Sequence, residues 1–430
     1  MTETTTDELR AARWVAVLFL LVVLTQRFSL PNQPIPLLLP VIGAWTVAAH
    51  AKGVVIVDRA RLGFWLAAAC IGALVMPVQA QLVPGAQISI TAWGLLVAVW
   101  LPFIVRLVHG STAAYLAMLR YATWIGVGLA ALCLLMMASQ FAGLPYQDFF
   151  SLVVPGPLQM DGFVITYPIT YGSAIYRANG WLGLEPSMVS AQLGLALLSA
   201  ILVKARSWQI VMILAGLAAA VSGSGIAIAG VGLAVMLVFR SRKLVVRYLP
   251  VAAIALVAIV RTPFGQSLIG RSTEFQNQNS STSLRALQPY QELFPIWRGH
   301  LSGVLLGYGP GSSQRVVESF GIVGLLVPSP AKIFFEYGLL AGGVVAAMML
   351  VCYWGGPSRA FAASLFVSLW VLQPGTTTMV IVAPLLIFVT LWSPRVEGPI
   401  EGPILQPPEE RLQNARSAST ATKTTVGSEP

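Results

Sequence analysis

LRYATWIGVGLAALCLLMMASQFA, at residues 119–142, contains Arg120 as its single charged residue. Such a stretch is long and apolar enough for an α-helix to cross the hydrocarbon core of a bilayer, which takes about 20 residues. Further apolar blocks with few charges lie on both sides of it, at 12–30, 35–50, 62–80, 88–108, 187–204, 208–222, 225–239, 247–261, 331–353, 360–373 and 377–392. The pattern predicts an all-α polytopic membrane protein of about twelve transmembrane helices. Because several blocks are short, counts of about ten or eleven stay open.

The composition of the chain is typical of a membrane protein. Of its 430 residues, 56% are hydrophobic and only 10% are charged, whereas soluble domains carry roughly 25% charged residues. The net charge of +10 would suit a nucleic-acid-binding protein. The basic residues lie in short segments between apolar blocks, however, so we expect no nucleic-acid partner. Cys70, Cys133 and Cys352 lie inside apolar blocks, which indicates neither a disulfide framework nor a metal cluster.

The positions of the basic residues predict how the chain crosses the membrane, because cytoplasmic loops carry an excess of Lys and Arg. If the N-terminus is cytoplasmic, the inner segments contain Arg10, Arg13, Lys52, Arg59, Arg61, Arg106, Arg120, Lys204, Arg206, Arg240, Arg242, Lys243, Arg247 and Arg359. The short outer segments at 77–87, 222–225 and 373–377 contain no Lys or Arg. We therefore expect both termini in the cytoplasm.

This topology divides the chain into a transmembrane domain, residues 1–393, and a tail, residues 394–430. The tail is rich in Pro, Ser, Thr and Glu and has no apolar period, which predicts a disordered cytoplasmic extension. Two long segments, about 143–186 and about 262–330, fall on the outer side as large extracytoplasmic loops. Long ordered loops usually carry function, so we expect the functional residues there.

The first outer segment ends in RANGWLGLEPS, residues 177–187, and leads into an apolar block. Pro186 suits the first turn of a helix, where its missing N–H is not needed. Glu185 then lies at a helix N-terminus, where the helix dipole favours a carboxylate. Two interpretations stay open. Glu185 either caps and positions the helix, or it orients and deprotonates an acceptor hydroxyl as a general base.

RANGWLGLEPS resembles the pattern of Arg, Gly and Glu-Pro-Ser at this place in the O-antigen polymerase/ligase superfamily of membrane glycosyltransferases. Three later stretches resemble the same family in the same order. They are a Ser-rich run followed by Arg in SSTSLRALQPY (280–290), a Gly-x-Gly element in LLGYGPGSS (305–313), and the helix opening KIFFEYGLLAGG (332–343). The spacing of Arg298 and Gly309 is similar to an Arg–Gly pair of the family's polymerases. The resemblance implies a protein of the bacterial inner membrane.

The family joins sugars carried on polyprenyl pyrophosphate at the outer face of that membrane. A sugar hydroxyl attacks the anomeric carbon, and the departing pyrophosphate gathers negative charge that fixed cations can stabilise. Arg binds phosphate in a bidentate manner and stays charged. The resemblance therefore implies that Arg177 and Arg285 act in catalysis with Glu185, and that Arg298 and Arg271 bind the substrate. We expect neither a cofactor nor a metal.

The same resemblance bears on four other residues. His300 is either a substrate-binding group, able to act as a base, or a loop histidine on the surface. Trp181 either stacks on a sugar ring or belongs to an interfacial aromatic belt. Gly309 belongs to the expected substrate-binding segment. Glu336 is expected to support the start of its helix.

The activity itself has alternatives. LVPSPAKIFFEYG (326–338) lacks the His that ligases of the superfamily usually carry there, which favours a polymerase. Ligase-like transfer of a finished glycan to another acceptor stays open. A transporter or flippase of a glycolipid or solute is the alternative from another class, and it would need a central polar cavity. The implied partners are the polyprenyl-pyrophosphate-linked glycan, membrane lipids, and chain-length regulator or flippase proteins.

Overall fold

The computed structural model describes residues 5–31, 35–160, 163, 165–169, 173–239, 287–321, 327–373, 376–393 and 400. Helices make up most of this part of the chain, which confirms the all-α fold class in its coarse form. The N-terminal helices are α1 (Thr6–Thr25), α2 (Leu38–Ala51), α3 (Arg59–Leu82), α4 (Ile90–Trp100), α5 (Thr112–Phe141), α6 (Phe149–Val153), α7 (Pro186–Leu202), α8 (Ser207–Ala220) and α9 (Gly223–Phe239). The later helices are α13 (Gln288–Arg298), α14 (Leu301–Leu306), α15 (Ser312–Ser319), α16 (Ser329–Val351), α17 (Arg359–Val367) and α18 (Met379–Phe388).

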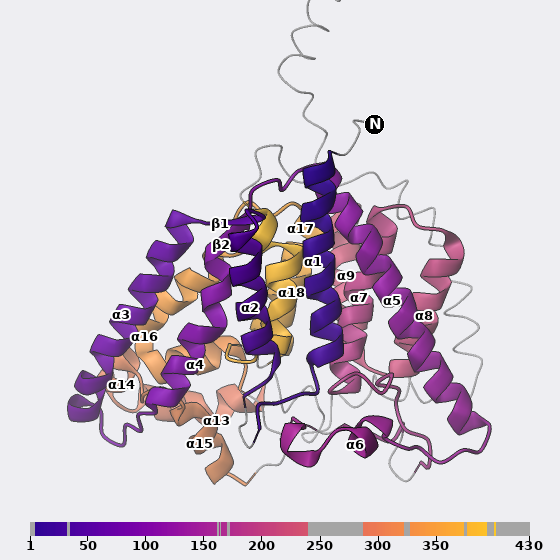
Figure 1. The fold of residues 1–430 in the computed structure, drawn as a ribbon. Helices are drawn as coiled ribbons and strands as arrows, with labels where there is room; N and C mark the ends of the chain where they lie inside the picture. The colour runs from indigo at the N-terminus through magenta and orange to yellow at the C-terminus, as the bar shows by residue number, and fades with distance from the viewer. Residues whose placement is uncertain are drawn as a thin grey trace, which may run out of the picture.

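The long helices stand side by side, and the short helices of the two expected outer segments lie at one end of them (Figure 1). We call this the loop end, and it carries α6, α13, α14 and α15. The N-terminus lies at the opposite end. There β1 (Val55–Val57) pairs antiparallel with β2 (Val105–Leu107), with Ile56 opposite Arg106. Within the described residues, this two-stranded sheet is the only one, and three isolated antiparallel bridges accompany it.

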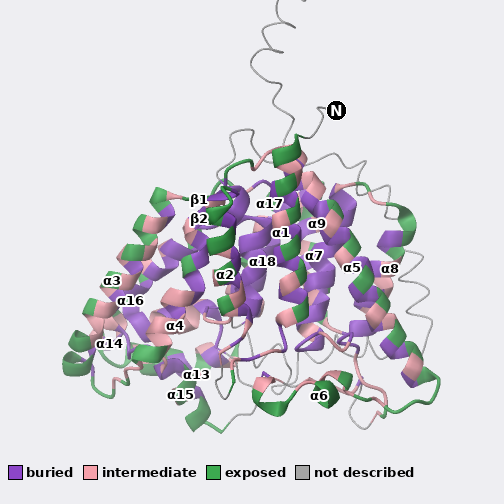
Figure 2. Ribbon diagram, in the orientation of Figure 1, coloured by how far each residue is buried: buried purple, intermediate pink, exposed green. Residues whose placement is uncertain are grey.

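The core of the bundle is built around α18, whose ten residues are all buried. Figure 2 shows the same burial along the faces of α1, α5 and α7 that look inward. Apolar residues dominate this interior, and the stacked rings of Phe361 and Phe388, with centroids 4.8 Å apart, lie within it. Helices that are apolar nearly all round pack in this way, because no single stripe has to face water.

Small residues set the closest helix contacts. A Cβ atom on Gly225 of α9 would lie 1.9 Å from the carbonyl oxygen of Ser190 in α7, and one on Gly194 would lie 2.5 Å from the Gly225 oxygen. The Ser190 hydroxyl accepts a hydrogen bond from the Gly225 N–H at 3.1 Å. Glycine lets the two backbones approach each other, as at small-residue helix interfaces in membranes.

One buried cation joins distant parts of the chain. Arg61, at the start of α3, is only 4% exposed. Its guanidinium donates to the carbonyl oxygens of Val105 at 3.0 Å, Thr390 at 2.9 Å and Ser393 at 2.5 Å. A buried charge is tolerated only when its donors are satisfied, so these bonds tie α3 to β2 and to the segment after α18.

The expectation of about twelve spans is not met by the described residues. Three of their helices, α3, α5 and α16, are long and apolar enough to cross a membrane. Seven shorter apolar helical segments accompany them, at Leu38–Ala51, Ile90–Ile104, Pro186–Leu202, Ser207–Ala220, Gly223–Phe239, Arg359–Leu372 and Met379–Trp392. The block at 88–108 shows the reason: α4 ends at Trp100 and is followed by a 3-10 turn and then by β2. The expected span at 247–261 lies outside the described residues.

The expected outer loops also need correction. The described part of 262–330 contains three helices, α13 to α15, and is therefore not a simple loop. The segment 143–186 contains α6 and a 3-10 turn at Gly156–Leu158 and is otherwise irregular where it is described. Of the tail at 394–430, only Ile400 is described, and its N–H donates to the Pro357 carbonyl at 2.9 Å.

The contact between α7 and α9 predicts that two glycines of α9 differ sharply in whether they tolerate a large side chain. Gly225→Leu is expected to lower the melting temperature and the yield of folded protein, because overpacking of this kind costs about 1–3 kcal/mol or more. Gly230→Leu is the matched control, since a Cβ atom at Gly230 meets nothing within 4 Å. Thermal unfolding in detergent measures both variants, and equal melting temperatures would contradict the close approach.

Candidate functional site

Arg177 lies in a short extended segment just before α7. Its N–H donates to the Tyr167 carbonyl at 2.8 Å, next to an antiparallel bridge between Pro168 and Tyr176. Its side-chain Nε donates to the Pro168 carbonyl at 3.1 Å, and the guanidinium carbon lies 5.3 Å from the centre of the Tyr167 ring. These contacts fix the plane of the half-buried guanidinium at the loop end.

The turn between Arg177 and the helix is stabilised by Asn179. Its side-chain oxygen accepts from the Trp181 N–H at 3.0 Å, and its backbone oxygen accepts from the Gly183 N–H at 2.9 Å. Trp181 has a positive φ of 58°, which is uncommon for a residue other than glycine. Its indole N–H donates to the Gln147 carbonyl at 3.2 Å, and its ring lies 5.5 Å from that of Phe149. The indole of Trp181 therefore packs against the first outer segment.

Glu185 is the N-cap residue of α7, in the position expected from Pro186. Its backbone is extended (φ −138°, ψ 154°), and it is 7% exposed. The carboxylate accepts from the Ser187 hydroxyl at 2.9 Å rather than from a backbone N–H of the first turn. Gln192, two helical turns further on, is also buried, and its amide oxygen has no hydrogen-bond partner within the described residues. Residues seven apart share one face of a helix, so Glu185 and Gln192 lie on the same face of α7, with the apolar Met188 and Val189 between them.

Arg27, which sequence reasoning missed, holds this junction to α1. It is 1% exposed, and its two terminal nitrogens donate to the two carboxylate oxygens of Asp148, at 2.7 and 2.5 Å. One of these nitrogens also donates to the Trp181 carbonyl at 2.8 Å, and the guanidinium carbon lies 4.2 Å from the centre of the Phe150 ring. A bidentate pair of this kind is strong and directional. The available signal was an Arg near the end of the apolar block at 12–30.

Burial and the ion pair together set the charge states of Asp148 and Tyr146. Burial alone would raise the pKa of Asp148, but hydrogen bonds from Arg27 and Ser151, with the charge of Arg27, outweigh it and hold that pKa below its ordinary value. Burial, reinforced by the negative charge of Asp148, raises the pKa of nearby Tyr146 to about 12. The junction therefore contains an ionised carboxylate, a buried guanidinium and a neutral phenol at ordinary pH.

A second set of residues at the loop end surrounds Glu336, in the N-terminal part of α16. Glu336 is 1% exposed, and its carboxylate accepts from the Ser313 hydroxyl at 2.5 Å. The amine of Lys332 lies 3.9 Å from the same carboxylate. The buried Gln79 of α3 donates to the carbonyl oxygens of Leu306 at 2.5 Å and Glu336 at 2.9 Å. Glu336 lies inside α16, seven residues after Ser329 and two before the non-helical Gly338, so these bonds hold the helix beside its break. The expected role of Glu336 at the start of its helix stays a prediction.

Gly309 lies in the turn before α15. It has a φ of +98°, which disfavours an L side chain, and its N–H donates to the Glu336 carbonyl at 3.0 Å. A Cβ atom there would lie 2.9 Å from the Gln87 carbonyl oxygen. The glycine is thus required by backbone geometry, and a role in substrate binding stays a prediction.

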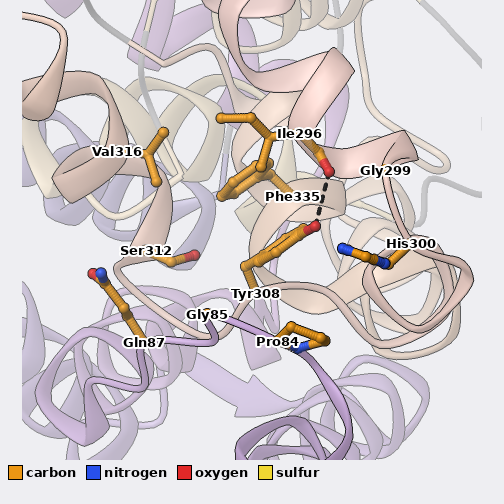
Figure 3. Close-up of a pocket in the computed structure, with 10 residues that line it drawn as sticks. All are labelled: Pro84, Gly85, Gln87, Ile296, Gly299, His300, Tyr308, Ser312, Val316 and Phe335. Carbon is orange, nitrogen blue, oxygen red and sulfur yellow. Dashed lines mark hydrogen bonds between the residues drawn. The ribbon is translucent and has the colours of Figure 1, made fainter.

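His300 lines a pocket of about 380 Å³ at the loop end, together with Tyr308 and Phe335 (Figure 3). Arg298 is exposed, and its guanidinium carbon lies 4.2 Å from the centre of the Phe294 ring. Neither residue contacts the Arg177–Glu185 junction in the hydrogen bonds and ion pairs that the structure records for the described residues. Both residues lie at the same end of the bundle as that junction. That this end is an outer functional face stays a prediction.

The structure therefore brings together part of the expected site. Arg177, Trp181 and Glu185 share one junction, and Arg27 and Asp148 belong to it as well. Arg271 and Arg285 lie outside the described residues. Within the described ranges, no group of three His, Cys, Asp or Glu side chains is placed to hold a metal ion. Comparison with models of protein families, with curated proteins and with solved structures found no match.

The Arg27–Asp148 pair predicts a stability that depends on pH. A carboxylate whose pKa is lowered by folding stabilises the folded state above its unfolded pKa, near 3.9. That contribution is lost as the pH falls through the lower value of the folded state. We expect Asp148→Asn to cost about 2–3 kcal/mol at neutral pH, through the lost charged hydrogen bonds.

The melting temperatures of wild type and Asp148→Asn, measured from neutral pH downward, test this. The difference between them should narrow below pH 4 or so, where Asp148 gains a proton and the wild type comes to resemble the amide variant. Asp7→Asn is the control, because no hydrogen bond or ion pair is recorded for the side chain of this exposed residue. A difference that stays constant with pH would contradict the ionised pair.

Proposed function

We propose that this chain is a membrane glycosyltransferase that polymerises or transfers polyprenyl-pyrophosphate-linked oligosaccharide units at the outer face of the bacterial inner membrane. The observation that supports this most is the junction before α7, where a buried carboxylate, Glu185, and an oriented guanidinium, Arg177, lie eight residues apart on one rigid turn. A nucleophilic substitution with an anionic leaving group needs these two functions at one place.

The proposed topology follows the charge pattern. The loop end faces the extracytoplasmic side, and the end with the N-terminus, β1 and β2 faces the cytoplasm, together with the C-terminal tail. The shorter apolar segments are proposed to lie tilted or broken within the bilayer. Three long apolar helices at least support a membrane location. Membrane lipids, chain-length regulators and flippases are the proposed partners.

The proposed reaction proceeds in one displacement. The acceptor hydroxyl oxygen attacks the anomeric carbon and loses its proton to the Glu185 carboxylate. The bond between the anomeric carbon and the pyrophosphate oxygen breaks, and its electron pair leaves with the polyprenyl pyrophosphate. Arg177 and Arg285 stabilise that leaving group, and Arg298 and Arg271 bind the substrate further out. A guanidinium pairs with phosphate oxygens in a fork, which a lysine amine cannot reproduce.

The environment of Glu185 suits a base that must be held in place. The carboxylate is buried and already accepts from Ser187, so its orientation is set before a substrate binds. Preorganised groups of this kind act without reorganisation at the moment of reaction.

The direct test is in-vitro extension of a polyprenyl-pyrophosphate oligosaccharide by purified protein in EDTA. Wild type is expected to produce ladders of extended glycan, whereas Arg177→Ala, Arg285→Ala and Glu185→Gln should lose roughly 100-fold or more of the rate, as expected for loss of a general base or a leaving-group clamp. Arg177→Lys should recover little of it, because the bidentate geometry is missing. Gel separation of labelled products gives the rates.

Arg120→Ala and Glu318→Gln are the matched controls, since both residues are exposed and lie away from the junction. Transfer of a single unit to another acceptor, without ladders, would favour the ligase-like activity. Movement of a glycolipid or solute across reconstituted vesicles, with no consumption of donor, would overturn the glycosyltransferase proposal in favour of a transporter.

A further inference from the structure

The pocket beside Tyr308 is built from three separate segments of the chain. Tyr308 and Phe335 form one wall, with nearly parallel rings whose centroids lie 5.0 Å apart at 17°. The Tyr308 hydroxyl donates to the Ile296 carbonyl at 2.8 Å (Figure 3), and its N–H donates to the Phe335 carbonyl at 2.8 Å. The Gln87 N–H donates to the Tyr308 carbonyl at 2.8 Å. The wall is therefore fixed by the α3–α4 connection, α13 and α16.

Polar groups stand around this aromatic wall. Figure 3 shows the side chains of Gln87 and His300 on either side of Tyr308. The structure records no hydrogen-bond partner for the amide of Gln87 or the imidazole of His300 among the described residues, and both residues are exposed. Ser312 also lines the pocket and donates its hydroxyl to the Gly309 carbonyl at 2.6 Å. Its oxygen keeps the capacity to accept a hydrogen bond.

This combination favours a sugar ring over other ligands. At about 380 Å³, the pocket has the size of a small-molecule site. A pyranose offers apolar C–H faces for aromatic and aliphatic walls, and hydroxyls at its edge for neutral donors and acceptors such as an amide and an imidazole. A hydrocarbon chain would offer no hydrogen-bond partner to the amide and the imidazole. A phosphate would require cations, whereas the residues that line this pocket carry no Lys or Arg.

We propose that this pocket is a saccharide-binding subsite that holds sugar rings of the glycan substrate, with Gln87 and His300 binding ring hydroxyls. This inference rests on the proposed function, since it names where the glycan of that substrate binds. It assigns Gln87, which no sequence motif indicated, to substrate recognition. It also assigns Tyr308 and Phe335, which lie in the stretches LLGYGPGSS and KIFFEYGLLAGG. Tyr308 and Phe335 shape the wall, and Gln87 and His300 give selectivity, because a site built to bind a hydroxyl rejects an analogue that lacks it.

The test uses full-length protein in nanodiscs and one defined probe. The probe is the oligosaccharide released by mild acid from the polyprenyl-linked glycan of the producing cell, without its lipid. Saturation-transfer NMR gives its dissociation constant. The double variant Gln87→Ala/His300→Ala is expected to weaken binding about tenfold, as for the loss of one or two hydrogen bonds. Val316→Trp, which fills the pocket from one lining residue, should abolish the signal.

The matched controls are Gln81→Ala, on the exposed surface of α3, and His109→Ala, at the opposite end of the molecule. Both should bind like wild type. Unchanged binding in the Gln87/His300 and Val316 variants would overturn the subsite, as would a probe that binds only when undecaprenyl pyrophosphate is attached. Failure of the subsite can be told apart from failure of the proposed function. If wild type extends the glycan and the pocket variants bind the oligosaccharide normally, the subsite alone is wrong. If the pocket variants lose oligosaccharide binding but wild type turns over no donor, the glycosyltransferase activity alone is wrong.

Discussion

The buried guanidinium of Arg27 is the constraint on which the arrangement of the loop end depends. A cation that is 1% exposed is costly unless each of its donors is satisfied. Asp148 supplies both carboxylate oxygens, and the Trp181 carbonyl supplies a third acceptor. Because these acceptors lie in the first outer segment and in the turn before α7, burying one side chain positions both relative to α1. The orientations of Arg177 and Glu185 follow from that turn.

A second buried polar side chain, the neutral amide of Gln79, holds the N-terminal part of α16. The buried amide of Gln79 bridges two carbonyl oxygens, at Leu306 and Glu336, that belong to segments far apart in the chain. The backbone there is so close that a Cβ atom on Gly338 would lie 2.4 Å from the Leu305 carbonyl oxygen, and Gly338 itself has a φ of +64°. Hydrogen bonds and glycine geometry thus hold α14, α15 and α16 against α3, and the Lys332–Glu336 ion pair lies among them.

Apolar periodicity predicted most of the helices, because the residues that one helix buries lie close together in the sequence. It predicted both ends of α16 to within two residues and the end of α5 to within one, although α5 starts seven residues before the expected block. Pro186 correctly marked the start of α7. It failed at 88–108, because a continuous apolar run does not distinguish a helix from the 3-10 turn and strand that replace its end. It also missed Arg27 and Gln79, because their partners lie 121 and 257 residues away and only the fold brings them together. The expected roles of Arg271 and Arg285 lie beyond the described residues.

The two regions of the loop end are anchored to different helices, and this bears on what they can bind. The junction with Glu185 is held by α1 and the first outer segment, whereas the Tyr308 pocket is held by α3, α13 and α16. A compact metabolite would be served by one of these regions. A chain of sugars attached to a lipid is extended, so it can react at one end while its rings are bound elsewhere. Under the proposed function, binding energy from such remote rings can position the reacting end, which is the advantage that a two-part loop end would offer to a polymer substrate.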